Sequence, residues 1–287
     1  MLYSESHNTP LHFLSMTLSN LLTHSQHLEN TQTMPTFFIG HGSPMNAVED
    51  NQFTNAWKEQ TKDIPKANAI LCVSAHWLTD GTFVQTTKHP ETIYDFYGFP
   101  DALYTLKYPA PGSPEYANVT QKEISSRKIV QDHAQGFDHW TWVILKHMFP
   151  DASIPVFQMS IDYYEKPEVH YQLGKELAGL REKGVLIIGS GNIVHNLRTI
   201  HFDTNASTFP WAKNFDEKVA ECIKKDDHEQ LLAYEKLGED ARLSVPTPDH
   251  YYPLLYILGT KKPQEQIRFF AEGMTNGSIG MRSLRIG

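Results

Sequence analysis

The sequence predicts an α/β fold: a single domain with a central mixed, mostly parallel sheet flanked by helices. From residue 35 onward, short runs rich in β-branched and aromatic residues alternate with segments of helical periodicity. Strands that alternate with helices indicate a mostly parallel sheet covered on both faces. No linker rich in Gly, Ser or Pro separates two cores, so we expect one domain over residues 35–287.

Short apolar runs bounded by turn residues predict the strands. These runs are residues 36–39, 69–74, 154–160 and 185–188. Residues 267–272 and 278–286 predict two further strands joined by a turn that contains glycine, hence antiparallel strands near the C-terminus. Apolar residues at helical spacing predict helices over residues 116–126, 139–148, 167–183, 211–224, 228–237 and 251–258.

Residues 1–34 form a polar N-terminal extension that we expect to lie outside the fold. They are rich in Ser, Thr, Asn, Gln and His and contain no Lys or Arg, which excludes a secretory n-region and an Arg-rich transit peptide. Leu11, Leu14 and Leu18 lie near helical spacing, so a short amphipathic helix that docks on the body or on a neighbouring subunit remains an alternative.

The charge balance excludes several classes of partner. The chain has 33 acidic and 25 basic residues, a formal charge of −8, and no run rich in Lys or Arg, so we expect no nucleic acid and no anionic membrane as partner. No segment approaches the roughly 20 apolar residues that cross a bilayer.

The two cysteines, Cys72 and Cys222, form no paired motif, which predicts a reduced, cytoplasmic protein.

Three of the 15 histidines follow predicted strands. His41, His76 and His195 each come after an apolar run that ends in a turn containing Gly or Ser. Ligands of open α/β sheets bind beyond the carboxyl ends of the strands, so these three imidazoles can converge. The alternative for each one taken alone is an ordinary hydrogen-bonded histidine, because no short metal-binding motif forces them together.

A fourth histidine, His250, follows Thr247 and Asp249. Either of these could cap a helix whose first turn would carry the imidazole. Four imidazoles, or three with a water, suit a divalent metal, and the ligand type leaves Zn, Fe, Cu and Ni open.

His139 lies at a predicted helix start, where Asp138 can cap the helix. The positive helix end would lower the pKa of the imidazole and favour a neutral base. The aromatic run 93–100 is either a loop that covers a flat ligand or a separate hydrophobic cluster. Ser43 and Ser190 lie in no nucleophile elbow and are interpreted as turn residues.

Together these segments resemble a known family. In chain order they are GHGSPMN at 40–46, SAHW at 74–77, YDF and GFP within 94–100, YPAPG at 108–112, GFDH at 136–139, GSGN at 189–192, HN at 195–196, and TP and HY within 247–251. The ordered set is similar to the 4,5-DOPA extradiol dioxygenase family, which belongs to the class III, LigB-type ring-cleaving dioxygenases. The match covers residues 35–287 and leaves out the extension.

The resemblance implies one divalent metal ion per chain, zinc or Fe(II), bound by His41, His76, His195 and His250. In LigB-type enzymes the residue in the position of His195 is an acid/base and the ligands are two His and one Glu, so His250 takes the place of the Glu. A set of three histidines carries one negative charge fewer than two histidines and a carboxylate, which favours zinc over iron without preventing iron binding.

The resemblance also implies the reaction and the roles of further residues. A small aromatic diol such as DOPA and O2 would react to give a ring-opened semialdehyde. His195 would act as the base and could also approach the metal, while His139 would hydrogen-bond the substrate or oxygen and supply a proton. Asp138 and Asn196 would orient the imidazoles. The aromatic walls of the site would be Trp77, Phe96 and Tyr97.

Two other functions fit the same residues. The first is a binding protein on the same fold, like the Memo-like relatives of these dioxygenases. The second is a zinc-dependent hydrolase, which would need a carboxylate base near the metal, with Asp95 and Asp249 as the candidates. The sequence leaves open whether the chain forms a homo-oligomer.

Overall fold

The computed structural model describes residues 31–287. The amphipathic helix considered for the N-terminal extension lies outside the described residues. No helix among residues 31–287 combines the length and the apolar character that a membrane span requires.

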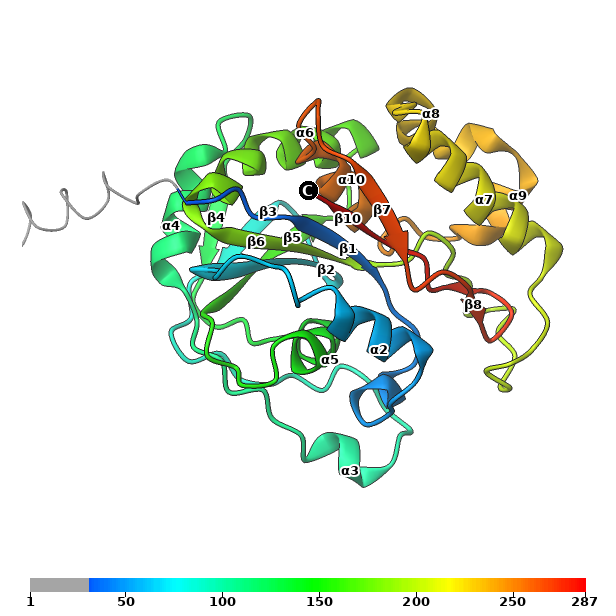
Figure 1. Cartoon of the computed structure of the whole chain (residues 1–287), viewed down its shortest axis with the longest axis horizontal. Coiled ribbons are helices and arrows are strands. Elements are labelled where there is room, and N and C mark those ends of the chain that lie inside the picture. The colour runs from blue at the N-terminus through cyan, green and yellow to red at the C-terminus, as the bar shows by residue number, and fades with distance from the viewer. Residues whose placement is uncertain (1–30) are drawn as a thin grey trace, which may run out of the picture. The chain divides into compact units, whose positions relative to one another are not determined.

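The strands of residues 31–287 form one mixed sheet of eight strands and a separate pair (Figure 1). The sheet order is β4-β3-β5-β2-β6-β1-β10-β7, and the bounds are β1 Thr36–Gly40, β2 Ala69–Thr79, β3 Thr82–Gln85, β4 Ile129–Asp132, β5 Val156–Asp162, β6 Val185–Gly191, β7 Ile267–Phe270 and β10 Ser283–Ile286. The separate pair is β8 (Met274–Thr275) and β9 (Ile279–Gly280). The central pairings β5-β2, β2-β6 and β6-β1 are parallel, whereas β10 pairs antiparallel with both β1 and β7. The predicted fold class is confirmed.

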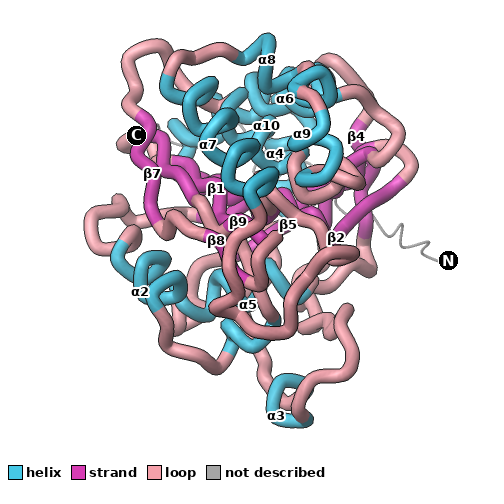
Figure 2. Tube along the Cα trace, turned by 90° about the vertical axis from the view of Figure 1, so that its right-hand side faces the viewer, coloured by secondary structure: helices cyan, strands magenta, loops and turns pink. Residues whose placement is uncertain are grey.

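Helices cover both faces of the sheet (Figure 2). The helices of one face are α4 Pro114–Glu123, α6 Pro167–Leu177, α7 Pro210–Lys224, α8 His228–Leu232, α9 Glu239–Ser244 and α10 Tyr252–Gly259. The other face carries α2 Gln52–Glu59, α3 Asp101–Tyr104 and α5 His139–Met148. Three short 3-10 helices are η1 Pro44–Ala47, η2 Ala178–Lys183 and η3 Tyr234–Leu237. Strands β1, β2, β5 and β6 are almost wholly buried between these layers.

Local sequence explains where the helices begin and end. Asp138 caps α5 by accepting hydrogen bonds from the backbone N–H groups of Trp140 and Thr141, as predicted. The predicted helix 167–183 is divided: α6 ends at Leu177, and η2 continues to Lys183, after which Gly184, with a φ of 77°, ends it. Strands β3 and β4 and helix α2 are short or polar segments that the periodicity did not predict.

Helices α6 and α10 pack closely because glycines face each other. A Cβ atom on Gly174 would lie 2.1 Å from the backbone oxygen of Tyr256 and 3.0 Å from Cα of Gly259. Helix α10 packs on β1, β2 and β6, so this contact supports the part of the sheet that carries the histidines.

Replacing Gly174 with Ala is expected to lower the free energy of unfolding by about 1–3 kcal/mol, because the added methyl group overlaps the backbone of α10. Urea unfolding measures the change. Gly179→Ala is the matched control, since its Cβ would meet only the side chain of Glu123, at 3.4 Å. Equal effects of the two substitutions would contradict the close packing.

Candidate metal centre

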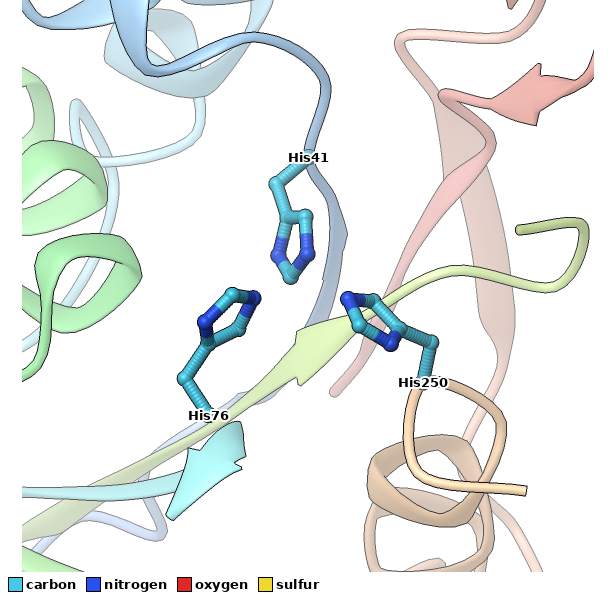
Figure 3. A group of neighbouring side chains, drawn as sticks. All are labelled: His41, His76 and His250. Carbon is cyan, nitrogen blue, oxygen red and sulfur yellow. The ribbon is translucent and has the colours of Figure 1, made fainter. Parts of the chain in front are cut away.

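Three predicted histidines meet at the carboxyl edge of the sheet. His41 follows β1 directly, His76 lies in β2, and His250 lies in the turn before α10. Figure 3 shows the three imidazoles, from three separate elements, pointing toward one another. The ring centroid of His41 lies 5.7 Å from that of His76 and 5.2 Å from that of His250, and the His76 and His250 centroids are 5.2 Å apart. One ring nitrogen of each lies within 4.8 Å of the other two.

Each of these imidazoles is held through Nδ1. Nδ1 of His41 lies 2.9 Å from Oγ of Ser190, and Nδ1 of His76 lies 3.0 Å from Oδ2 of Asp95. Nδ1 of His250 is hydrogen-bonded to Oδ2 of Asp249. An ionised carboxylate only accepts hydrogen bonds, so Nδ1 of His76 and of His250 carries the hydrogen and Nε2 carries the lone pair.

The three Nε2 atoms are buried and have no hydrogen-bond partner among residues 31–287. Buried polar atoms in proteins are almost always paired, so three unpaired ring nitrogens at one point indicate a missing partner. Three neutral imidazole nitrogens suit a divalent transition-metal ion and leave coordination positions free for reactants. The donor set therefore fits one divalent cation.

Burial sets the protonation states in this cluster. Burial and the neighbouring imidazoles lower the pKa of His41 well below 6.5, and burial also lowers the pKa of His250 against the opposing effect of Asp249. Burial raises the pKa values of Asp95 and Asp249, but hydrogen bonds from histidines outweigh it and hold both pKa values below the usual range. At neutral pH His41 and His250 are therefore neutral and the two carboxylates are charged.

His195 lies beside this cluster, stacked on His250. The two ring centroids are 3.5 Å apart and the planes differ by 6°. One ring nitrogen of His195 lies within 4.8 Å of a nitrogen of His250 and an oxygen of Asp249. Burial, together with repulsion from His250 when both rings are protonated, lowers the pKa of His195 well below 6.5. This neutral imidazole is therefore available as a proton acceptor next to the three-histidine group.

His139 lies on the other side, against His76. It is the first residue of α5, and its ring centroid is 4.4 Å from that of His76. Its Nδ1 lies 2.9 Å from Oδ1 of Asp95. Burial lowers the pKa of His139, while Asp95 opposes that shift. The structure brings all five predicted imidazoles, those of His41, His76, His139, His195 and His250, into one region.

Asp138 and Asn196, predicted to orient imidazoles, form no side-chain hydrogen bond to an imidazole among residues 31–287. Asp138 accepts from Oγ of Ser74 at 2.9 Å, besides capping α5, so it fixes the helix that starts with His139. Nδ2 of Asn196 donates to the backbone oxygen of Leu243 at 2.7 Å, which holds the loop after His195. Both residues act on the backbone that carries a histidine.

The predicted aromatic walls differ in exposure. The ring of Phe96 lies 5.2 Å from that of His139 and also contacts Phe99, so it belongs to a hydrophobic cluster that reaches the site. Trp77 is buried, with 7% of its surface exposed, whereas Tyr97 is 92% exposed. Of the three, Phe96 is the ring in contact with a site histidine.

One local prediction was wrong. Helix α10 begins at Tyr252, and its N-cap residue, Tyr251, makes no side-chain capping bond. His250 therefore precedes the helix, and neither Thr247 nor Asp249 caps it. The carboxylate of Asp249 binds the imidazole of His250 and so is not available to the helix amides.

The sequence did not reveal two contacts of His41. The indole of Trp140 stacks on its ring, with centroids 4.1 Å apart and planes 4° from parallel. Ser190, interpreted as a turn residue, holds its Nδ1. Ser43 does act as a turn residue, since its Oγ accepts from the backbone N–H of Met45 to cap η1.

The end of β6 fixes the backbones of two site histidines. The backbone N–H of Asn192 donates to the oxygen of His250 at 2.8 Å, and its Nδ2 donates to the oxygen of His41 at 2.5 Å. A Cβ atom on Gly191 would lie 2.3 Å from the oxygen of His250, so only glycine allows this approach.

Comparisons with known proteins agree with this architecture. Residues 34–281 match the family described as the catalytic LigB subunit of aromatic ring-opening dioxygenase. A protein of Escherichia coli (strain K12) named 4,5-DOPA dioxygenase extradiol is 45% identical over 257 residues, which is 88% of this chain and 95% of that protein. One of the same name from Beta vulgaris is 40% identical over 231 residues, 78% of this chain and 85% of that protein. The crystal structure of an uncharacterized protein from E. coli K12 aligns with a TM-score of 0.78 at 41% identity, covering 88% of this chain and 100% of that one.

The metal-free protein is expected to lose stability as the pH falls from about 7 to 5. The folded-state pKa values of His41, His195 and His250 lie below 6.5, so in this range the unfolded chain binds protons that the folded chain does not. Below about pH 6.5, the pKa of histidine in the unfolded chain, each such histidine lowers the free energy of unfolding by up to about 1.4 kcal/mol per pH unit. Above about pH 6.5 these histidines cause no loss.

Urea unfolding of chelator-treated protein at about pH 7.5, 6.5 and 5.5 measures this loss. His41→Gln removes one of the groups and should make the pH dependence shallower. A free energy of unfolding that stays constant over the range would contradict the assigned protonation states.

Proposed function

The chain belongs to the LigB family of extradiol aromatic ring-opening dioxygenases, and we propose that it cleaves catechols such as DOPA at the 4,5 bond with O2. The product would be a ring-opened semialdehyde. The observation that carries the proposal is the group of three buried Nε2 atoms of His41, His76 and His250, which have no partner within residues 31–287 and are each fixed through Nδ1.

His41, His76 and His250 would hold one divalent metal ion, zinc or Fe(II). Their neutral donors, anchored by Ser190 and two carboxylates, support this assignment. When bound, the ion supplies positive charge that favours ionised diol oxygens and a position where diol and O2 meet. His195 lies against this group, stacked on His250, so it could be a fourth ligand or the base. The two roles predict different results for the variant His195→Ala.

His195 would be the base that takes a hydroxyl proton from the diol. It is neutral at pH 7 because burial lowers its pKa, and its stacked position on His250 keeps it at the edge of the metal group. A base must be in this form to accept the first proton.

His139 would hydrogen-bond the substrate or oxygen and return a proton. The carboxylate of Asp95 beside its Nδ1 opposes the lowering of its pKa by burial, and so favours the protonated ring that has a proton to give. Phe96, next to His139, supports an aromatic wall for a flat ring, and Trp77 and Tyr97 complete the proposed wall.

We assign the catalytic domain to residues 35–287 and leave the extension 1–34 outside it.

The two free cysteines, Cys72 and Cys222, are buried and distant in sequence, which suits a reducing cytoplasmic location. The partners would be the small aromatic diol and O2.

Zinc-dependent hydrolysis is less favoured by the geometry. It needs a free carboxylate to activate water, but Asp95 and Asp249 both bind Nδ1 of a metal-group histidine, on the side of the ring away from the unpaired Nε2. Their hydrogen bonds orient imidazoles and leave no base of this type in the group.

Protein reconstituted anaerobically with Fe(II) is expected to consume O2 on addition of DOPA and to form a yellow semialdehyde. An oxygen electrode and the visible spectrum follow the reaction, and zinc-loaded protein serves as the comparison, since zinc has no redox chemistry. No oxygen uptake with any member of a catechol panel would contradict the proposed substrate class.

Substitutions separate metal ligands from the base. His41→Ala, His76→Ala and His250→Ala should each lose bound metal, because each removes one of three donors. His195→Ala should retain metal yet lower kcat by about 10²–10⁴-fold, as expected when a general base is removed. Metal analysis beside kcat tests this, and metal loss in His195→Ala equal to that of the other three would make His195 a ligand.

A further inference from the structure

Asp95 touches two functional histidines at once. Its Oδ2 lies 3.0 Å from Nδ1 of His76, a proposed metal ligand. Its Oδ1 accepts a hydrogen bond from the backbone N–H of His139, the proposed proton donor, at 2.9 Å. The same oxygen lies 2.9 Å from Nδ1 of His139, which makes no hydrogen bond within residues 31–287 but can form an ion pair with Asp95 when the ring is protonated. One carboxylate therefore bridges the group that binds metal and the group that moves a proton.

The other anchors of the site touch only one of these imidazoles each. Asp249 is hydrogen-bonded to Nδ1 of His250, and Ser190 contacts Nδ1 of His41. Within residues 31–287, Asp95 is thus the side chain whose two oxygens approach two different imidazoles of the site. This difference provides a matched comparison between Asp95 and Asp249.

The segment that carries Asp95 is attached to the same helix as His139. The backbone N–H of Ile93 donates to the oxygen of Phe137, and the backbone N–H of Phe137 donates to the oxygen of Glu91, both at 2.8 Å. Nε1 of Trp142, in α5, donates to the oxygen of Ile93 at 2.9 Å. The carboxylate therefore links this unit to His76 in β2.

Resting on the proposed function, we propose that Asp95 is a positioning residue that fixes His76 for metal binding and His139 for proton transfer. As the acceptor from Nδ1 of His76, it directs the Nε2 lone pair into the three-histidine group. As the acceptor from the backbone N–H of His139 and the charge beside its Nδ1, it holds the start of α5 in place and favours the protonated ring. Loss of the carboxylate should damage both functions.

Asp95→Asn and Asp249→Asn test this as a pair, because each exchanges one carboxylate for an amide of the same shape. Both should weaken metal binding about 10–100-fold in a chelator competition assay on the full chain. At saturating metal, Asp249→Asn should lower kcat less than Asp95→Asn does, because it leaves both contacts of His139 in place. Asp95→Asn should retain a deficit of about 10²-fold in kcat with little change in KM, because its second contact serves the chemical step.

The substitution His139→Ala shows whether Asp95 acts through His139. In that background Asp95→Asn should still weaken metal binding but should lower kcat at saturating metal no further. Full recovery of kcat by Asp95→Asn with excess metal, or additive losses in the double variant, would overturn the proposal. Urea unfolding of each variant verifies that the fold is kept.

A measurement that does not depend on turnover tests the role of Asp95 separately from the proposed dioxygenase activity. In zinc-loaded protein, nitrogen-15 NMR of the imidazoles should show Asp95→Asn altering the Nδ1 signals of both His76 and His139, and Asp249→Asn altering that of His250. A change confined to His76 would overturn the shared role. Absence of any turnover by the wild-type protein would contradict the proposed function alone.

Discussion

The central constraint on this molecule is the burial of three imidazole nitrogens that nothing else in residues 31–287 satisfies. An unpaired buried polar atom costs about 1–3 kcal/mol, so the fold holds Nε2 of His41, His76 and His250 in a state that only a bound partner relieves. Anchors on Nδ1 prevent the rings from turning to find other partners. The rest of the site is arranged around this unsatisfied centre.

The sheet order explains how distant residues meet this constraint. Strand β6 lies between β2 and β1, so its end adjoins both strands that deliver His76 and His41. Ser190 and Asn192 at that end bind His41, and Asn192 also binds the backbone of His250. Ligand sites in α/β sheets lie beyond such carboxyl ends, and here the strand end itself supplies the fixing groups.

The sequence predicts the part of the site that follows from burial and strand direction. His41 follows β1 directly, His76 lies in β2 and His195 comes four residues after the end of β6, so the fold class places them at one edge of the sheet. The cap of α5 by Asp138 follows from local residue types. The order of motifs along the chain added the link to ring-opening dioxygenases.

The remainder depends on packing that no local pattern encodes. Asp95 meets His76 across 19 positions because the loop that carries Asp95 folds back over the sheet edge. Ser190 meets His41 across 149 positions because β6 pairs in parallel with β1. The helix after His250 was predicted within one residue at each end, but its cap was not. A carboxylate that can cap a helix can also bind an imidazole, and Asp249 binds that of His250. Strands β3 and β4 are short and carry polar residues, so periodicity gave no signal for them.

X-ray absorption spectroscopy of protein loaded with one equivalent of metal tests the three-nitrogen centre most directly. The account predicts one tightly bound ion per chain with imidazole scattering from three histidines at about 2.0–2.1 Å for zinc. A first coordination sphere without three imidazoles, or a His41→Ala variant with the same spectrum as the wild type, would contradict it.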